Sequence, residues 1–217
     1  MTNIGNRYEI SSLTNDKIKL INSLHHRKYR REHNLFVAEG IRICREAVEN
    51  GWEIRYLLYD NLNVDFQKIE NLISDVLCLG ADVIGVTSKI LSKISHKENS
   101  QNVLCVICQK WNDLPDIIKD KTFVALETVR DPGNLGTILR TMDGVGATDC
   151  VLLDHCTDPF SYESVRASMG AIFNVNIIAS STKNFLKWKS KHKISLIGTS
   201  LINATDYTKT NWQLPFV

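Results

Sequence analysis

The 217-residue sequence has no apolar run near the roughly 20 residues that a membrane-spanning helix requires. Its polar start, MTNIGNRYEI, lacks the apolar core of a secretory signal peptide. Internal repeats and low-complexity segments are absent as well. These absences predict a globular chain that stays in the cytoplasm, and apolar residues, at 43%, are numerous enough to form a buried core.

Net charge is also small, at +2, so the total charge does not indicate a nucleic-acid partner. The charges are unevenly placed, however, because residues 17–45 are strongly basic and have three histidines interleaved. The densest part of this segment consists of Arg27, Lys28, Arg30 and Arg31. Such a cluster predicts an RNA footprint that contacts phosphates and A-form shape rather than base edges. A solvated helix end would explain the same charges.

Metal binding is suggested by only one spacing among the six cysteines. Cys105 and Cys108 have the two-residue gap of many zinc sites. The run NVLCVICQ around them is apolar and β-branched, and in a strand this odd offset places the two side chains on opposite faces. No second pair has ligand spacing. We therefore expect reduced cysteines in the core and no metal site.

Hydrophobic periodicity predicts a compact α/β unit over residues 1–108. Helices are expected at 14–30, opened by Thr14 or Asn15, at 41–50, at 65–74 and after Thr87 or Ser88. Strands are expected at 54–60, 76–79, 83–86 and 103–108. The polar, charged segment 109–121 contains one of only four prolines, and we interpret it as a domain linker.

Residues 122–217 alternate regularly between strand and helix patterns. The expected strands are 122–127, 149–153, 174–178 and 193–197, and the expected helices are 134–145, 162–170 and 183–190. This alternation predicts a parallel sheet covered on both faces. In such sheets, ligands bind outside the carboxyl ends of the strands.

The stretch RDPGNLGTILRT lies at one of these carboxyl ends. Pro132 and Gly133 should break the strand, and Asn134 is a suitable N-cap for a helix whose free amides could bind an anion. Leu135, Ile138, Leu139, Met142 and Val145 form the expected buried face, and Gly136, Arg140 and Asp143 the opposite face. Because Gly136 has no side chain, a ligand could lie against the helix there and meet Arg140. A well-capped connecting helix with Arg140 as a surface charge is the alternative.

Three segments resemble a known family. LETVRDPGNLGTILRTMDGVGATDCVLLD is similar to the first motif of the SpoU (TrmH) class of SPOUT methyltransferases, a strand followed by Asn-x-Gly and Arg-Thr. SVRASMGAIFNVNI, residues 164–177, resembles the segment that follows it in that class. LINSLHHRKYRRE and HNLFVAEGIRICREAVENGWEIRYLLYD resemble the substrate-binding domain that precedes the catalytic domain in many ribosomal-RNA members. The resemblance covers most of the chain.

The resemblance implies S-adenosylmethionine-dependent methyl transfer to a ribose 2′-hydroxyl of RNA, above all ribosomal RNA. The implied architecture is a small α/β RNA substrate-binding domain, 1–108, and a parallel-sheet SPOUT (α/β knot) methyltransferase domain, 122–217, in a homodimer. Asn134 and Arg140 take the positions of the catalytic pair, and Thr199 lies where the class binds the adenosine of the cofactor.

The chemistry favours particular roles for these residues. A ribose hydroxyl must be aligned with the methyl donor, and its developing negative charge must be stabilised. Because a guanidinium holds its proton strongly, we expect Arg140 to be a phosphate clamp and electrostatic partner, with Asn134 positioning the hydroxyl or the arginine. Arg166 would hold an RNA phosphate and Ser168 would cap or contact it, although a surface ion pair is the alternative for Arg166.

The sequence also departs from the family pattern. Tyr162 and Glu163 stand where basic or proline residues are common. The second motif, Gly-x-Glu, and the third, Ser-Leu-Asn, have no counterpart, and NWQLPFV resembles the lead-in to the second. We therefore expect an incomplete methyltransferase domain without the C-terminal knot segment, inactive by itself. A non-catalytic RNA-binding protein derived from this family is one alternative, and a phosphate-ligand enzyme of another α/β family is a second.

Overall fold

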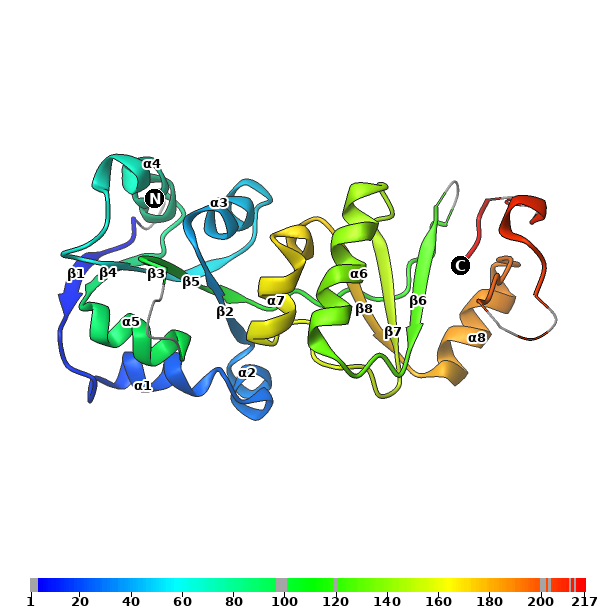
Figure 1. Ribbon diagram of the computed structural model, residues 1–217, viewed down its shortest axis with the longest axis horizontal. Helices are drawn as coiled ribbons and strands as arrows, with labels where there is room; N and C mark the ends of the chain where they lie inside the picture. Colours follow the sequence, from blue (N-terminus) through cyan, green and yellow to red (C-terminus); the bar gives the residue numbers. More distant parts are fainter. Residues whose placement is uncertain are drawn as a thin grey trace.

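The computed structural model describes residues 4–96, 101–118, 121–199, 202, 204–210, 212 and 214–217. These residues form two α/β units, one around a five-stranded sheet and one around a three-stranded sheet (Figure 1). The units lie end to end along the long axis, with the N-terminus in the first and the C-terminus in the second. No helix in the described part of the chain is long and apolar enough to cross a membrane.

The first unit is built on a mixed sheet. Its strands are β1 (Arg7–Ile10), β2 (Leu35–Glu39), β3 (Ile54–Asp60), β4 (Asp82–Val86) and β5 (Val103–Cys108), and its helices are α1 (Asp16–Ser23), α2 (Arg27–His33), α3 (Ile41–Glu49), α4 (Phe66–Cys78) and α5 (Ser88–Ser95). The strand order is β1-β4-β3-β5-β2, in which β5 is antiparallel to both neighbours and the other pairs are parallel. In Figure 1, α1 and α5 cover one face, and α3 and α4 the other.

The central strands are buried on both faces because helices cover both sides of the sheet. On β5, Cys105 packs in the core beneath α3 and α4, whereas Cys108 packs against the core beneath α1 and α5. The two side chains therefore lie on opposite faces, as the strand pattern predicts. Burial raises the pKa of the Cys108 thiol to about 11 and that of Cys150 to about 12, so both are neutral thiols at neutral pH.

The single helix expected at 14–30 is wrong. Asn15 caps α1 as expected, its side chain accepting from the amide of Lys17, but α1 ends at Ser23 and a second helix, α2, follows. The guanidinium of Arg30 stabilises the break, because its Nη1 donates to the carbonyl oxygens of Leu24 and His25 at 2.7 Å each. The end of the first helix is therefore stabilised by Arg30, which lies after the break in the sequence.

Two further differences concern strands. Residues 76–79 form the end and C-cap of α4 instead of the expected strand, because Val76 packs in the core as part of the buried face of that helix. The sequence patterns also miss β1 and β2. β1 has only four residues and lies at the edge of the sheet, where half of its pattern is exposed, so it gives little periodic signal.

The second unit is built on a parallel sheet, as the alternation of strands and helices predicts. Its elements are β6 (Phe123–Glu127), α6 (Pro132–Gly144), β7 (Asp149–Leu153), α7 (Tyr162–Ser168), β8 (Asn176–Ser180) and α8 (Thr182–Lys191), with 3-10 turns at Ala171–Phe173 and Tyr207–Lys209. The strand order is β6-β7-β8, with both pairs parallel. α6 covers the face toward the first unit, and α8 covers the opposite face (Figure 1).

The strand expected at 193–197 is present only as a bridge. Ser195 pairs in parallel with Phe216, and Phe216 pairs in parallel with Thr122 beside β6. The amide of Ile197 donates to the carbonyl oxygen of Val217 at 2.8 Å. Residues 216–217 thus lie between the edge of β6 and the segment around Ser195.

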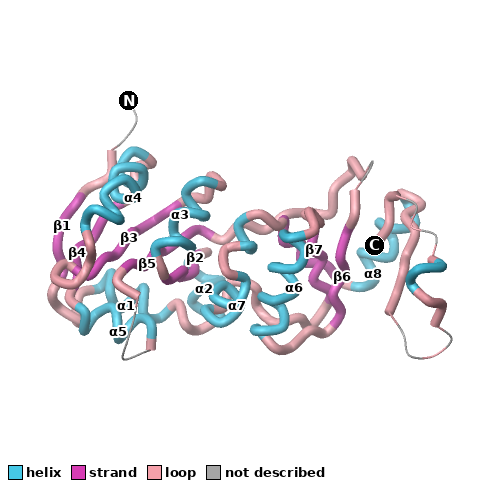
Figure 2. The backbone as a smooth tube through the Cα atoms, turned by 45° about the horizontal axis from the view of Figure 1, so that its top comes forward, coloured by secondary structure: helices cyan, strands magenta, loops and turns pink. Residues whose placement is uncertain are grey.

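One hydrophobic core runs through both units. Phe36 and Trp52 of the first unit meet Phe160 and Phe173 of the second, and the ring centroids of Phe36 and Phe160 are 4.9 Å apart. The indole of Trp52 donates to the carbonyl oxygen of Phe173 at 3.0 Å. Figure 2 shows α7 between the two sheets, with α6 on one side and β2 on the other. The interface is therefore packed like a domain interior.

The described part of the predicted linker, 109–121, belongs to this interface. Gln109 is buried, and its side-chain nitrogen donates to the carbonyl oxygens of Arg30 and Leu35. Trp111 donates to the Gln109 side chain at 3.0 Å, and its ring centroid lies 5.0 Å from that of Phe160. Lys119 and Asp120 lie outside the described residues. The start of the segment is thus held in place, because Gln109 contacts the first unit and Trp111 contacts the second.

Candidate functional site

The first turn of α6 follows the carboxyl end of β6. Asp131 is its N-cap, and the side chain accepts a hydrogen bond of 2.6 Å from the amide of Asn134. Pro132 occupies the start of the helix, where its missing N–H costs nothing. The prediction that Asn134 is the N-cap is therefore wrong. Asn134 lies within the first turn with an exposed side chain, so it faces solvent at this edge of the sheet.

Gly136 does not offer room for a ligand, which corrects a second prediction. A Cβ there would lie 2.5 Å from the Cβ of Ala167, 2.6 Å from the carbonyl oxygen of Ser164 and 2.8 Å from the amide of Ser168. Gly136 is buried because α7 crosses α6 at this point. The glycine therefore permits close helix packing, and the side chains of α6 that remain accessible here are those of Thr137 and Arg140.

Val145 does not belong to the buried face of the same helix, so that prediction is wrong as well. α6 ends at Gly144, which leaves Val145 at the C-cap with a side chain that is 75% exposed. Of the other expected core positions, Leu135, Leu139 and Met142 are buried, and Ile138 is partly buried against the same core.

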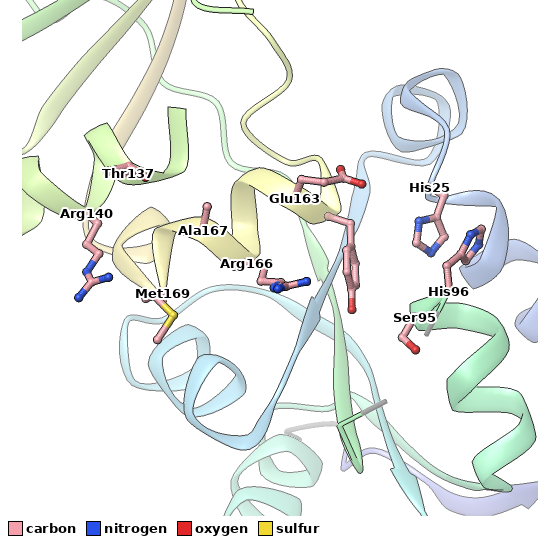
Figure 3. A pocket seen from close by; sticks show the side chains of 10 residues that line it. His25, Ser95, His96, Thr137, Arg140, Glu163, Arg166, Ala167 and Met169 are labelled. Atoms are coloured by element: carbon pink, nitrogen blue, oxygen red, sulfur yellow. The ribbon is translucent and has the colours of Figure 1, made fainter. Parts of the chain in front are cut away.

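Arg140 lies on the exposed face of α6 and lines an open cavity of about 650 Å³ between the two units (Figure 3). The cavity lining is formed by His25, Ser95, His96, Thr137, Arg140, Tyr162, Glu163, Arg166, Ala167 and Met169. Arg140 and Arg166 therefore border one space, although they come from neighbouring helices. In Figure 3 the Arg166 side chain points toward the side on which Ser95 and His96 lie.

His25 and His96 form the wall opposite the helices of the second unit. Their ring centroids are 3.8 Å apart, and the Tyr162 ring centroid lies 5.4 Å from that of His25. A His25 ring nitrogen is hydrogen-bonded to the carbonyl oxygen of Ile94. Burial, assisted by the neighbouring His96, lowers the pKa of His25 below its ordinary value. The sequence patterns miss this wall, since no spacing connects residues 25, 96 and 162.

Ser168 is fully buried, and its hydroxyl donates to the carbonyl oxygen of Val165 at 2.8 Å. The predicted RNA contact of Ser168 is therefore wrong, because its side chain is buried and its hydroxyl is hydrogen-bonded within α7. Arg166, on the same helix, is exposed and borders the cavity. Of the two residues predicted on α7, only Arg166 can reach a ligand.

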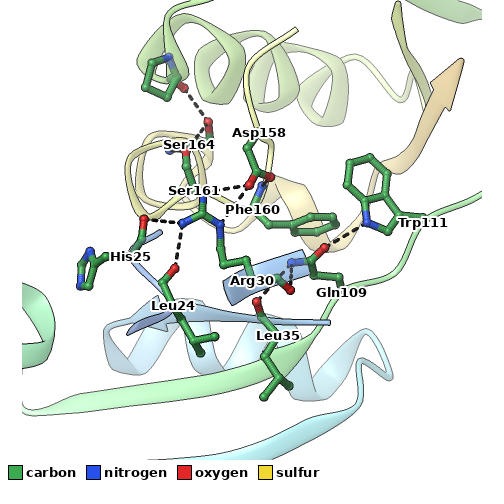
Figure 4. A network of polar contacts seen from close by, with 11 residues as sticks. Leu24, His25, Arg30, Leu35, Gln109, Trp111, Asp158, Phe160, Ser161 and Ser164 are labelled. Atoms are coloured by element: carbon green, nitrogen blue, oxygen red, sulfur yellow. Dashed lines mark hydrogen bonds and ion pairs between the residues drawn. The ribbon is translucent and has the colours of Figure 1, made fainter. Parts of the chain in front are cut away.

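Arg30 is likewise removed from the predicted RNA footprint. Its side chain is buried and forms an ion pair with Asp158 of the second unit, at 2.8 Å from Nη2 and 3.0 Å from Nε (Figure 4). The remaining nitrogen, Nη1, holds the Leu24 and His25 carbonyl oxygens described above. All three nitrogens are thus directed into the protein. Arg27, Lys28 and Arg31 are exposed on α2 and remain available to a polyanion.

A second cavity, of about 500 Å³, lies on the face of β6 that carries α8. Its walls are mostly apolar and include Leu153, Phe185 and Leu196, while Glu127 and Thr199 bring polar groups to it. Thr199 is exposed, at the position predicted for adenosine binding. An apolar slot with a few polar groups suits a flat heterocycle attached to a sugar. This cavity and Arg140 thus lie on opposite faces of the small sheet.

The turn after β7 supports this second cavity. Asp154 has a left-handed backbone, φ 51°, and accepts hydrogen bonds from the amide and hydroxyl of Thr182, at the start of α8. Those bonds hold the pKa of Asp154 below its usual value. Within the described residues no group of three or more His, Cys, Asp or Glu side chains is arranged to hold a metal ion.

Comparison with known proteins gives a match for each unit. Residues 15–105 match the MRM3-like substrate binding domain, and residues 121–217 match the SpoU rRNA Methylase family. The AdoMet-bound crystal structure of an rRNA methyltransferase from Sinorhizobium meliloti has a TM-score of 0.89 to this chain and 36% sequence identity, over 97% of this chain and 79% of that chain.

Two curated relatives extend the comparison. The 23S rRNA (guanosine(2553)-2'-O)-methyltransferase RlmP of Bacillus subtilis is 26% identical over 199 residues, which are 92% of this chain and 76% of that protein. The mitochondrial rRNA methyltransferase 3 of Xenopus tropicalis is 28% identical over 214 residues, which are 93% of this chain and 48% of that protein. The chain therefore spans about half the length of the second relative.

Proposed function

Since the chain belongs to the SpoU rRNA methylase family and carries an MRM3-like substrate-binding domain ahead of the methylase domain, we propose that it transfers a methyl group from S-adenosylmethionine to a ribose 2′-hydroxyl of ribosomal RNA. The observation that carries this proposal is the exposed Arg140 on α6, which borders a cavity shared with the substrate-binding domain. The names of the relatives, which are rRNA 2′-O-methyltransferases or rRNA methyltransferases, support the substrate class.

S-adenosylmethionine supplies an electrophilic methyl group when it is bound. The apolar cavity beside β6 would hold its adenosine, and Leu153, Phe185 and Thr199 are among the residues that line it. No metal enters this proposal, because the sulfonium needs no Lewis acid to activate it. The methyl group would have to extend from this cavity past the carboxyl end of β6, where α6 begins, so that a ribose hydroxyl beside Arg140 could reach it.

The ribose hydroxyl must lose its proton as it becomes a nucleophile, so negative charge develops on its oxygen. Arg140 is suited to stabilise that charge and the adjacent phosphate, because a guanidinium is a permanent cation with several donors. Asn134, exposed in the first turn of the same helix, orients the hydroxyl or the arginine in this scheme. Neither residue has to accept the proton, which passes to solvent or to an RNA phosphate.

RNA is held, in this proposal, by cations from both domains. Arg27, Lys28 and Arg31 project from α2, and Arg166 projects from α7 into the cavity. These cations bind phosphates, so they supply affinity and register without reading sequence. Because the two domains share one core, the cations keep a fixed spacing, and recognition depends on RNA shape.

Two further parts of the proposal rest on the sequence and the family resemblance alone. The functional form is a homodimer, and it acts in the cytoplasm. Light scattering during size-exclusion chromatography, at several protein concentrations, would measure the first, and imaging of the tagged gene product would test the second.

The direct test is methyl transfer in vitro. The protein is incubated with deproteinised ribosomal RNA and S-adenosylmethionine labelled on the methyl group, and the RNA is digested to nucleosides. Label in 2′-O-methylnucleosides supports the proposal and contradicts the expectation that this chain is inactive by itself. Label in base-methylated nucleosides contradicts the proposal. RNA binding with steep salt dependence, without cofactor binding or label transfer, would favour a non-catalytic RNA-binding protein instead.

A further inference from the structure

The cavity between the two domains has walls of different chemistry. On the methylase side, Arg140 and Arg166 bring two permanent cations to it. On the substrate-binding side, the His25 and His96 rings lie 3.8 Å apart. At about 650 Å³ the cavity falls within the size range of small-ligand pockets, about 300–1,000 Å³.

The imidazole wall is suited to stacking. Burial keeps the pKa of His25 below its ordinary value, so the ring is neutral at neutral pH and does not repel the ring of His96. The hydrogen bond to the carbonyl oxygen of Ile94 holds the His25 ring in place. The Tyr162 ring, 5.4 Å from that of His25, extends the aromatic surface. A preformed aromatic surface of this kind binds the face of an unpaired base.

The one carboxylate among the described lining residues is Glu163. A carboxylate would repel a phosphate, so the phosphate belongs near Arg166 and Arg140, not on this side. A carboxylate can, however, accept hydrogen bonds from the N–H groups of a base edge. The cavity thus has cations for a phosphate, an aromatic ring for a base face and a hydrogen-bond acceptor for a base edge. A single nucleotide can use all three.

We propose that this cavity is a subsite for one unpaired nucleotide of the RNA substrate, whose base stacks on the exposed His96 ring, which itself packs on the ring of His25, while its phosphate is held by Arg166. The subsite rests on the proposed function and adds to it. It places a nucleotide beside the ribose that is methylated, since Arg140 borders both. A fully paired duplex cannot present a base face to this wall, so RNA with an unpaired nucleotide is the preferred substrate class.

The test uses the whole chain and a short single-stranded RNA that carries 2-aminopurine, with a blunt duplex of the same sequence as the second probe. Stacking on an aromatic ring quenches 2-aminopurine fluorescence. His96→Asn removes the ring but suits the left-handed backbone of this residue, φ 54°. We expect His96→Asn to weaken single-strand binding about tenfold and to abolish quenching, with duplex binding almost unchanged. His96→Phe, which keeps a ring, should retain both.

His26→Asn is the matched control, because His26 is the neighbour of His25 but is exposed and does not line the cavity. It should leave quenching intact, and thermal melting of each variant reports whether it is folded. If the wild type methylates ribosomal RNA while His96→Asn binds and quenches as the wild type does, the subsite is wrong and the proposed function stands. If the wild type binds neither probe and transfers no methyl group, the proposed function fails as well.

Discussion

Arg30 of the substrate-binding domain and Asp158 of the methylase domain are 128 residues apart in the sequence, yet their side chains form a 2.8 Å ion pair inside the protein. Both side chains are less than a tenth exposed. The same arginine also holds the break between α1 and α2, so one guanidinium connects α2 to the methylase domain. Domain orientation and the position of α2 are therefore coupled.

Replacing Asp158 by Ala should destabilise the protein strongly. The substitution leaves the buried charge of Arg30 without a partner, which typically costs about 3–5 kcal/mol of unfolding free energy. Chemical denaturation measures the loss. Asp116→Ala is the control, since its ion pair with Lys191 lies at the surface and its removal should leave the midpoint unchanged. Equal midpoints for the two variants would show that the buried pair is not structural.

Gly136→Ala should destabilise the packing of α6 against α7. The added Cβ would meet Ala167 and the backbone of Ser164 at 2.5 and 2.6 Å, and such overpacking costs about 1–3 kcal/mol. Gly144→Ala, at the end of the same helix, meets nothing within 4 Å and should instead stabilise by about 0.4–1 kcal/mol. The two melting temperatures should move in opposite directions. If Gly136 instead faced a ligand cavity, the melting temperature of Gly136→Ala would stay near that of the wild type.

Arg140→Ala should lose methyl transfer by roughly a hundredfold or more, because a donor aimed at developing charge is removed. The fold should survive, since Arg140 is exposed. Arg42→Ala, an exposed arginine on α3 that does not line the cavity, should keep wild-type turnover. Initial rates of transfer and melting curves of both variants check these outcomes, and near wild-type turnover by Arg140→Ala would remove its assigned role.

Replacing Arg27, Lys28 and Arg31 together by Ala should weaken RNA binding. The slope of log affinity against log salt concentration should fall by about one for each phosphate that the variant no longer neutralises, while cofactor affinity stays the same. Replacing Lys183, Lys187 and Lys191 of α8 by Ala is the charge-matched control and should have a smaller effect. If the slope falls equally in both triple variants, the footprint is not on α2.

His25 makes stability depend on pH. Burial lowers its pKa in the folded state below the ordinary value of 6.5, so below pH 6.5 the unfolded chain binds the proton more readily. The stabilisation is present above that pH and is lost as pH falls through the lowered pKa. His25→Gln should flatten this part of the stability curve, whereas His26→Gln, at an exposed site, should retain the slope. Denaturation midpoints between neutral and mildly acidic pH provide the measurement.

Sequence pattern predicts the structure well where local features decide it. The strands at 54–60, 103–108 and 149–153 match the structure at both ends, because each is a buried apolar run between polar turns. Prediction from the sequence fails where the burial of a residue depends on a partner far away in the sequence. Arg30 and Ser168 resemble RNA-binding residues in the sequence, and only the approach of Asp158 and the packing of α7 on α6 show that they are buried.

Gly136 illustrates the same limit, since its missing side chain makes room for Ala167 and not for a ligand. The accessibility of Arg140 is predicted correctly, because helical periodicity alone places it opposite Leu135 and Leu139. The cavity that it borders could not be derived, because its lining comes from segments far apart in the sequence.

The central claim is ribose methylation of ribosomal RNA. Its most direct test is to map 2′-O-methylation across the ribosomal RNA of cells that carry the gene and of cells from which it has been deleted. We predict that deletion removes methylation at a specific ribose, and that the wild-type gene restores it but the Arg140→Ala gene does not. An unchanged map of ribose methylation after deletion would contradict the account.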